Sequence, residues 1–467
     1  MTDYSDTICA PATSAAGGAI AVVRISGPDS LPVTDRVVRF RKGDASGARG
    51  YTLKFGEIPG VDQVVAAIYR APHSYTGEDS VELSCHASPY IVGRIISLLC
   101  EAGCRVAEAG EFTRRAFVNG KMDLAQAEAV ADVIAASSES QHRVAMNQLR
   151  GGYSAELGKI RAQLLELSAL VELELDFSEE EVEFADRSKL AGLLDDATRR
   201  CRSLADSFRL GNAIRNGVPV AIAGAPNSGK STLLNALLKD DRAIVSDVPG
   251  TTRDTVEETC VLGGVLFRFI DTAGIRETSD KVEKLGIERT FNKTAEAEVV
   301  LGVVDMTCPK SEILDQVSQL AGMVDQDRQT LVILLNKCDL AGVSGVNKNV
   351  SDINKLVLSA CDEGFKGKVL GISAKSGSGL EELLKVLVEA VGDLSPDRVL
   401  VTNARHAEAL REAAEALEAA RRGLTSLPTD LLAEDLRDAV AKLGSITGEI
   451  TTDEVLSEIF GRFCIGK

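Results

Sequence analysis

The fold is decided by residues 224–232, which read Gly224-Ala225-Pro226-Asn227-Ser228-Gly229-Lys230-Ser231-Thr232. The apolar, β-branched segment VPVAIAG leads into this stretch, and STLLNALLKD continues it with leucines at helical spacing. A strand, a glycine loop and a helix in this order form a phosphate-binding loop. The glycines let backbone N–H groups surround an anion, and the helix N-terminus adds partial positive charge. We therefore predict a nucleotide site here.

Length and composition limit the class of protein. A chain of 467 residues favours roughly three domains. Hydrophobic residues make up 45% and charged residues 26%, as in soluble globular proteins. No run approaches ~20 consecutive apolar residues, and the first residues lack the pattern of a secretory signal. Ten scattered cysteines fit a reducing compartment. We expect a cytoplasmic protein without a membrane anchor.

The net charge of −17 argues against a protein that coats nucleic acid by bulk electrostatics. A local basic patch remains compatible with this charge. Any nucleic-acid substrate would need a basic partner to help hold it.

The pattern of apolar and polar residues divides the chain into four segments. Residues 1–120 predict an α+β domain, with strands at 17–27 and 81–87 and a helix at 88–103. Residues 218–393 alternate strands and helices, as in a doubly wound, Ras-like α/β domain.

The segments on either side of the α/β domain, 121–217 and 394–467, are helical, and residues 188–217 are expected to form a single helix. Neither helical segment is complete by itself. We predict that the two pack together as one discontinuous all-α bundle, into which the α/β domain is inserted.

Three further motifs follow the glycine loop in the order found in GTPases: DTAG at 271–274, NKCD at 336–339 and SAK at 373–375. Lys230 would reach the β- and γ-phosphates, and Asp339 can accept hydrogen bonds from guanine N1–H and N2–H₂. The SAK stretch would supply a backbone N–H for the guanine oxygen. The residues predicted to bind GTP are Asn227, Ser228, Gly229, Lys230, Ser231, Thr232, Ser246, Thr251, Thr252, Asp271, Gly274, Asn336, Lys337, Asp339, Ser373, Ala374 and Lys375.

Residue 275 indicates an unusual hydrolytic mechanism. Ras-type GTPases place a glutamine after DxxG to orient the attacking water, but this chain has Ile275. Another group must polarise the water, and Glu277, Glu283 and Glu288 lie just downstream. One of them would act through a bridging water, and a solvated acidic face is the favoured interpretation for Glu277 and Glu288.

Asn227 offers a second clue within the glycine loop. Its amide oxygen can coordinate a monovalent cation beside the phosphates and so replace the charge of an arginine finger. Its alternative role is hydrogen bonding within the loop.

At this point the chain resembles the MnmE (TrmE) family of bacterial tRNA modification GTPases along nearly its whole length. The matching stretches are DTI, VVRISG, SYTGED, GEFTRRAFVNGKMDLAQAEA, GAPNSGKS, GTTRD, DTAGIRE and the terminal FCIGK. The resemblance implies a partner, the flavoprotein MnmG (GidA), and a tRNA substrate modified at C5 of the wobble uridine. It implies an aminomethyl or carboxymethylaminomethyl product and 5-formyl- or 5,10-methylene-tetrahydrofolate as one-carbon donor. It also implies a homodimer, formed through the N-terminal domain, within a heterotetramer.

The resemblance assigns roles to particular residues. Ser231 and Thr252 would bind Mg²⁺, and Glu283 would be the general base acting through water. K⁺ would be surrounded by Asn227, Ser246, Val248 (through its carbonyl) and Thr251. Folate would be lined by Arg24, Glu82, Lys121 and Lys467, with the Cys464 thiol near the one-carbon chemistry.

Each of these N- and C-terminal residues has an alternative role. Arg24 and Glu82 would form a surface ion pair, Lys121 would be a charge at a helix start, and Cys464 would be structural.

Two rival functions share the GTPase motifs. One is a regulatory switch in ribosome assembly similar to Era, and the other is a folate-binding aminomethyltransferase relative with an acquired switch. The terminal FCIGK and the folate-like N-terminal domain favour the tRNA-modifying enzyme over the Era-like switch. Dependence on a flavoprotein partner separates it from the transferase.

Overall fold

The computed structural model describes residues 5–14, 18–176, 187–239, 244–245, 258–270, 296–325, 327–340, 367–392, 398–424, 429–461, 463 and 466. The chain forms two compact units, which are treated separately below. The first comprises Met1–Ala131, Gln148–Thr198 and Glu412–Lys467, and the second comprises Asp132–Asn147 and Arg199–Arg411. Within the described part of the chain, every helix is too short or too polar to cross a membrane.

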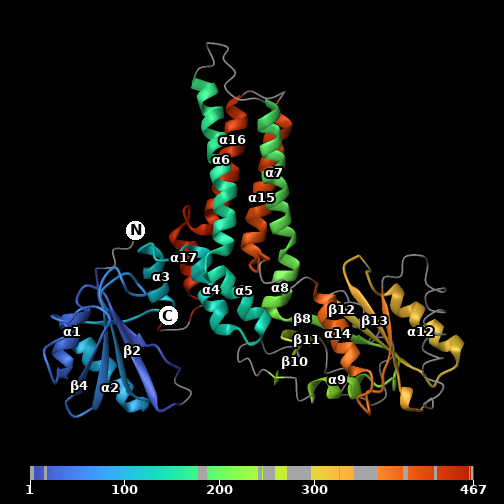
Figure 1. Cartoon of the computed structure of the whole chain (residues 1–467), viewed down its shortest axis with the longest axis horizontal. Coiled ribbons are helices and arrows are strands. Elements are labelled where there is room, and N and C mark those ends of the chain that lie inside the picture. The colour runs from blue at the N-terminus through green and yellow to red at the C-terminus, as the bar shows by residue number, and fades with distance from the viewer. Residues whose placement is uncertain are drawn as a thin grey trace. The chain divides into compact units, whose positions relative to one another are not determined.

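A sheet with strand order β3-β4-β5-β6-β2-β1-β7 dominates the N-terminal part of the first unit (Figure 1). Its pairs are antiparallel apart from β1 and β7, which are parallel. The strands are β1 Ile8–Pro11, β2 Ile20–Ser26, β3 Arg39–Phe40, β4 Thr52–Ile58, β5 Asp62–Tyr69, β6 Ser80–His86 and β7 Arg105–Val106.

Helices α1 (Ser30–Val37) and α2 (Pro89–Glu101) cover one face of this sheet. Alternate residues of β2 and β6, such as Val23 and Leu83, are buried beneath them, because successive side chains of a strand point to opposite faces. The strands predicted at 17–27 and 81–87 and the helix predicted at 88–103 are confirmed as β2, β6 and α2.

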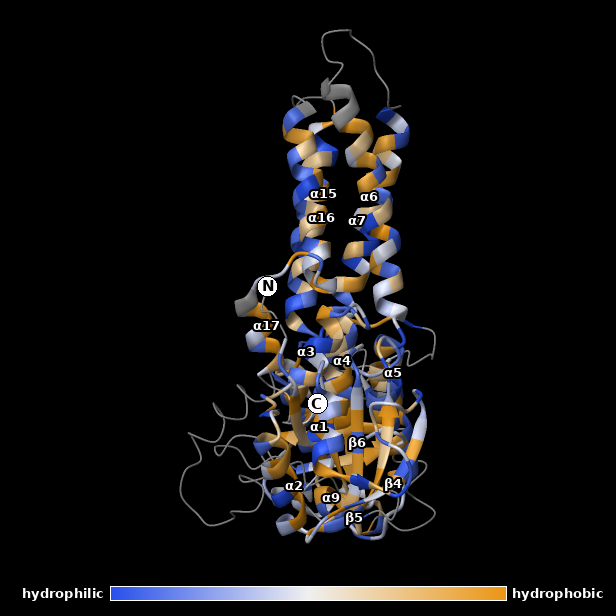
Figure 2. Ribbon diagram, turned by 90° about the vertical axis from the view of Figure 1, so that its left-hand side faces the viewer, coloured by the Kyte–Doolittle hydropathy of each residue, from blue (hydrophilic) through white to orange (hydrophobic). Residues whose placement is uncertain are grey.

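A further set of helices flanks the α/β region in sequence. They are α3 Glu111–Val118, α4 Leu124–Ala135, α5 Glu139–Leu149, α6 Gly152–Asp176, α7 Arg187–Asp206, α8 Phe208–Asn216, α15 Ala404–Gly423, α16 Thr429–Thr447 and α17 Asp453–Phe460. Figure 2 shows that the long helices carry both hydrophobic and hydrophilic residues. In α6 the buried side chains recur every three or four positions, as expected when one face is buried: Tyr153, Leu157, Ile160, Leu164, Leu167 and Val171.

In the first unit, helices from before and after the α/β region lie side by side. Helix α6 packs along α16. An ion pair of 3.1 Å joins Arg421 of α15 to Asp195 of α7, and one of 3.0 Å joins Lys442 of α16 to Glu412 of α15. The discontinuous helical bundle predicted from the sequence is therefore present. The exact domain boundaries given above remain a prediction.

The helix predicted at 188–217 is in fact two helices, α7 and α8, which are separated at Ser207. The Ser207 hydroxyl donates to the Leu204 carbonyl (2.6 Å) and accepts from the Val401 N–H (3.1 Å). Gly211 of α8 also lies close to Val401, because a Cβ at residue 211 would be 2.1 Å from the Val401 carbonyl oxygen. A distant segment thus sets the break, which is why helical periodicity alone misses it.

The second unit contains an α/β sheet with strand order β14-β13-β12-β8-β11-β10-β9. The strands are β8 Val218–Ala223, β9 Ile244–Val245, β10 Glu258–Leu262, β11 Val265–Ile270, β12 Val299–Asp305, β13 Thr330–Asn336 and β14 Lys368–Gly371. The five strands β14, β13, β12, β8 and β11 are parallel. Their carboxyl ends therefore share one edge, where α/β folds bind ligands.

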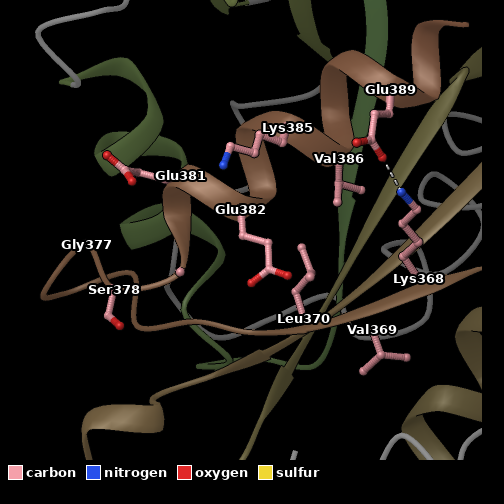
Figure 3. A pocket seen from close by; sticks show the side chains of 11 residues that line it. Lys368, Val369, Leu370, Gly377, Ser378, Glu381, Glu382, Lys385, Val386 and Glu389 are labelled. Atoms are coloured by element: carbon pink, nitrogen blue, oxygen red, sulfur yellow. Dashed lines mark hydrogen bonds and ion pairs between the residues drawn. The ribbon is translucent and has the colours of Figure 1, made fainter.

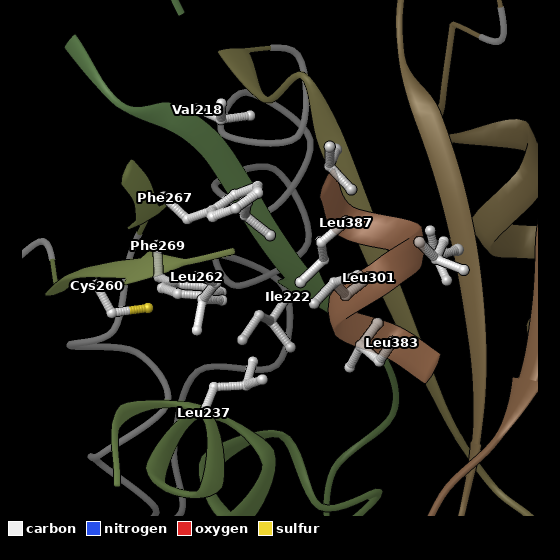
Figure 4. Close-up of a cluster of buried hydrophobic side chains, with 14 of the residues drawn as sticks. Val218, Ile222, Leu237, Cys260, Leu262, Phe267, Phe269, Leu301, Leu383 and Leu387 are labelled. Carbon is white, nitrogen blue, oxygen red and sulfur yellow. The ribbon is translucent and has the colours of Figure 1, made fainter. Parts of the chain in front are cut away.

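Helices cover both faces of the second sheet. One core contains Phe267, Leu301 and Leu387 and involves α8, α9 (Lys230–Leu238) and α14 (Leu380–Val391); part of it is drawn in Figure 4. The other core lies under α12 (Lys310–Gly322). This two-layered burial explains why β8, β12 and β13 read as continuous apolar runs.

Candidate guanine nucleotide site

The glycine loop connects β8 to α9, as its sequence predicts. Gly224 has φ +147°, and a Cβ there would lie 2.2 Å from the Val303 carbonyl oxygen. Gly229 has φ +104°, and a Cβ there would lie 2.2 Å from Asn336 Nδ2. Both positions combine a left-handed backbone with a close neighbour, so only glycine fits.

Lys230 folds over the loop that precedes it. Its Nζ donates hydrogen bonds of 2.8 Å to the carbonyl oxygens of Gly224 and Ala225. Burial lowers the pKa of its ammonium group. A phosphate placed in the loop would offer this half-buried cation a stronger partner than two neutral carbonyls.

Neighbouring residues of the loop differ in exposure. Asn227 is exposed and has a positive φ of 58°, whereas Ser228 is buried. The Ser228 hydroxyl has no hydrogen-bond partner within the described residues, so it is a buried polar atom suited to a ligand. Ser231 is half-buried at the start of α9, and Thr232 is exposed.

Asn336 joins the glycine loop to the loop after β14. Its Nδ2 donates to the Ser228 carbonyl (2.8 Å), and its Oδ1 accepts from the Ala374 N–H (3.0 Å). The side chain is buried at the end of β13. The first residue of NKCD therefore ties together the predicted phosphate-binding and guanine-binding segments.

Lys337 and Asp339 follow at the same sheet edge. Lys337 forms a 2.5 Å ion pair with Asp305, the last residue of β12. Burial alone would raise the pKa of Asp305, but hydrogen bonds from Lys337 and Thr307 outweigh it and lower that pKa. Asp339 lies in the short helix η2 (Cys338–Leu340) and is exposed, as a carboxylate that recognises a base must be.

Asp305 was not among the residues predicted from the sequence. The signal that could have found it is its position, because it is the polar residue that ends a buried strand next to β13.

The SAK segment has one backbone donor available for guanine. The Ser373 N–H donates to the Ser378 carbonyl (2.9 Å), and the Ala374 N–H is held by Asn336. Lys375 is exposed at the same turn. Its N–H is therefore the candidate donor to the guanine oxygen.

Several predicted site residues lie outside the described residues. From the switch regions these are Ser246, Val248, Thr251, Thr252, Asp271, Gly274, Ile275 and Glu283, and from the C-terminus Cys464 and Lys467.

The predicted folate residues of the first unit gather around residues 74–79. Arg24 and Glu82 are directly opposite each other on β2 and β6 and form an ion pair of 2.9 Å. The Arg24 guanidinium lies 5.1 Å from the centre of the Tyr75 ring and 5.6 Å from that of Phe112. The predicted ion pair between Arg24 and Glu82 is therefore present, and two aromatic rings lie beside its guanidinium.

Lys121 also reaches this segment. Its Nζ donates to the Pro72 carbonyl (2.9 Å), and its side chain lies beside Gly77. The end of the chain approaches the same sheet, because Gly466 is buried and a Cβ there would be 2.0 Å from the Pro11 carbonyl oxygen. Helix α17 holds the end of the chain near this sheet, because its Phe460 packs against Phe117 and Leu124.

A separate hollow of about 840 Å³ lies between β14 and α14 (Figure 3). A 2.5 Å ion pair joins Lys368 to Glu389 at its border. It is lined by no residue of the glycine loop or of NKCD. It is therefore distinct from the nucleotide site.

The parallel sheet, the glycine loop and the NKCD and SAK segments at one sheet edge define a P-loop GTPase. Two family models match the chain: "GTP-binding protein TrmE N-terminus" over residues 7–121 and "MnmE helical domain" over residues 124–464. The chain belongs to the MnmE (TrmE) family.

Curated relatives match the chain from end to end. Proteins named tRNA modification GTPase MnmE from Bacteroides thetaiotaomicron and Porphyromonas gingivalis are each 48% identical to it, over 99% of this chain and 99% and 98% of their own. The protein of that name from Flavobacterium johnsoniae is 46% identical, over 99% of both chains. Among solved structures, the G domain of FeoB from Methanococcus jannaschii matches 38% of this chain and 98% of its own at 28% identity, with a TM-score of 0.27 that is too low to add to the argument. Because the relatives match outside the α/β domain as well, the Era-like interpretation is not favoured.

Proposed function

We propose that the chain is the GTP-hydrolysing component of a tRNA-modifying complex. Its product would be an aminomethyl or carboxymethylaminomethyl group at C5 of the wobble uridine. The observation that carries the proposal is that Asn336 joins the glycine loop to the SAK segment in a chain that matches tRNA modification GTPases over 99% of its length.

The donor chemistry of the glycine loop fits a metal–nucleotide complex. Ser231 and Thr252 would hold Mg²⁺, which neutralises phosphate charge when bound. Asn227, Ser246, Val248 and Thr251 would hold K⁺. The exposed amide of Asn227, at a left-handed position of the loop, supports this assignment. Lys230 would exchange its two carbonyl partners for phosphate oxygens, and Glu283 would orient the attacking water.

The chemistry of the N-terminal cluster fits a tetrahydrofolate. Glu82 is a carboxylate that can accept from an aminopyrimidone edge, and Arg24 holds that carboxylate in place by its ion pair. Lys121 is a cation that can pair with a glutamate tail. The Nε and Nη2 atoms of Arg24 both contact the same carboxylate oxygen, Glu82 Oε1. Lys467 would complete the pocket, and the buried position of Gly466 against Pro11 supports its approach. Bound folate supplies the one-carbon unit, and Cys464 would lie near that chemistry.

Net charge and exposed apolar surface support the partners that the family resemblance implies. A chain of net charge −17 needs a basic partner surface to hold tRNA, a role proposed for the flavoprotein MnmG (GidA) in the cytoplasm. Tyr51, Leu53, Phe55 and Val65 are exposed on β4, β5 and the turn before β4. Such a cluster supports a homodimer formed through the N-terminal domain, within a heterotetramer.

Nucleoside analysis of tRNA tests the proposal. Cells that lack the chain's own gene would receive wild-type chain or Asp339→Asn, and the modified wobble uridine would be quantified by mass spectrometry. We expect the wild type to restore the nucleoside and the variant to fail. Absence of the nucleoside with wild-type chain and flavoprotein both present would refute the proposal. Restoration without the flavoprotein would instead favour the self-sufficient transferase.

A further inference from the structure

Positive charge is concentrated around the connection between β3 and β4 in the first unit. Residues 39–54 contain five cations and one carboxylate, Asp44, in a chain whose net charge is −17. Lys54 is half-buried, because its Nζ donates to the Lys42 carbonyl (2.8 Å). The four exposed cations are called the cation cluster below: Arg39, Arg41, Lys42 and Arg49.

The cation cluster is not neutralised by its surroundings. Arg39 lies opposite Glu57 in the register of β3 and β4, but no ion pair joins the two side chains. The other three cations likewise form no ion pair with a carboxylate of the described residues. Arg41 contacts an aromatic ring instead, because its guanidinium lies 4.6 Å from the centre of the Phe55 ring. The positive charge of the cluster is therefore available to a ligand.

The nearby carboxylates shape the turn that carries these cations. Asp35 of α1 accepts hydrogen bonds from the N–H groups of Ala45 (2.5 Å) and Ser46 (3.0 Å). Asp44 accepts one from the Gly47 N–H (2.7 Å). A turn fixed in this way presents its cations at a reduced cost of ordering when a ligand binds.

The cluster lies at one end of the open face of the sheet, which is the face opposite α1 and α2. Arg41 lies over Phe55, and Phe55 is an exposed residue of β4 that alternates with more buried ones. The register places Leu53, on the same face as Phe55, in one row with Glu82 and Arg24. Four strand spacings of ~4.8 Å separate β3 from β2, so the cluster lies about 20 Å from these candidate folate residues.

We propose that the cation cluster is an RNA-binding site that holds the phosphate backbone of tRNA on the open face of the sheet. This inference rests on the proposed function, which makes tRNA the substrate. Guanidinium and ammonium groups that lack carboxylate partners pair with phosphate oxygens, and such contacts position an RNA without reading its sequence. An aromatic ring beside an arginine is the surface on which unpaired bases stack. The cluster supplies local attraction for RNA on an acidic chain, on the face that carries the candidate one-carbon site.

Fluorescence anisotropy of the full chain with a labelled tRNA transcript tests the proposal. The cluster variant combines Arg39→Gln, Arg41→Gln, Lys42→Gln and Arg49→Gln. Each phosphate contact contributes about 0.7 to 0.9 to the slope of log K against log salt concentration, so the loss of four contacts should reduce that slope by about 3. Kd for tRNA in about 0.1 M KCl should rise at least about 10-fold. Exposed substitutions rarely unfold a protein, and far-UV circular dichroism would establish that the variant is folded.

Four exposed cations that already have carboxylate partners provide a control with the same change of net charge. Their pairs with Glu101, Glu156, Asp325 and Glu408 have lengths of 3.3, 3.2, 3.8 and 3.0 Å. We expect this control variant to bind tRNA within about twofold of the wild type. Its substitutions are Arg94→Gln, Lys159→Gln, Arg328→Gln and Arg411→Gln.

Three results would overturn the proposal. The first is wild-type affinity and salt dependence in the cluster variant, and the second is an equal loss in the control variant, which would show an effect of bulk charge. The third is displacement of labelled tRNA by poly-L-glutamate as readily as by unlabelled tRNA, which would assign the cluster to an acidic protein surface. If the wild-type chain still restores the modified nucleoside in cells, any of these results removes the RNA site and leaves the proposed function standing.

Discussion

Replacement of Asn336 by alanine should weaken nucleotide binding more than replacement of an exposed residue outside the site. The side chain makes two hydrogen bonds, to the Ser228 carbonyl (2.8 Å) and from the Ala374 N–H (3.0 Å), and both partner residues are buried. A buried polar group left without its partner costs about 1 to 3 kcal/mol, so two cost about 2 to 6 kcal/mol. Taking the lower end, and assuming that binding must restore the order of both loops, Kd for GDP should rise at least about 30-fold.

The assay is a fluorescence titration of the full chain with a labelled GDP analogue. Asn235→Ala is the matched control, because Asn235 is exposed on α9 in the same unit and should leave Kd unchanged. Far-UV circular dichroism would establish that both variants remain folded. Binding by Asn336→Ala within threefold of the wild type would show that Asn336 does not hold the two loops together, and the reasoning would be wrong.

Three further outcomes are expected. Asp339→Asn should bind GTP more weakly and xanthosine triphosphate more tightly in competition binding, because an amide donor replaces one carboxylate acceptor facing the base. An unchanged preference for GTP would contradict the role of Asp339. Lys337→Met should lower the melting temperature at pH 7, where Asp305 is ionised, and the loss should shrink as the pH falls below about 4. The reason is that the lowered pKa of Asp305 reflects a stabilisation that disappears when its carboxylate is protonated. A loss of melting temperature that does not change with pH would exclude the ion pair as its cause. GTP turnover should be faster in KCl than in NaCl at equal ionic strength, and Asn227→Ala should remove the difference; equal wild-type rates would eliminate the potassium mechanism.

Local features of the fold were predictable from the sequence. The strand, glycine loop and helix at 218–238 follow from apolar periodicity and glycine spacing, which act within a few residues. The same holds for β2, β6 and α2. The carboxyl ends of the parallel strands also lie where an α/β fold must place them.

Contacts between distant residues were not predictable. The break at Ser207 depends on Val401, which is 194 residues away in sequence. The bridging role of Asn336 depends on Ser228 and Ala374, which lie on different loops. A motif names these residues, but only the packed structure shows which atoms they bind.

The buried Arg115 is the clearest example of this limit. Arginine is almost never fully buried unless it is paired, so a sequence pattern assigns it to the surface. In the structure it is fully buried and forms ion pairs with Asp6 (2.6 Å), Glu78 (3.2 Å) and Glu111 (2.9 Å). This network fixes residues 74–79 beside the candidate folate residues, and no local signal announces it.

The most direct test of the account is the turnover of GTP and ATP, measured side by side, by the full chain in KCl with Mg²⁺. If Asp339, Asn336 and the SAK turn form a guanine site beside the glycine loop, GTP will be hydrolysed and ATP will neither be hydrolysed nor inhibit. Comparable turnover of the two nucleotides would contradict the guanine site, and with it the assignment of the chain as a GTPase.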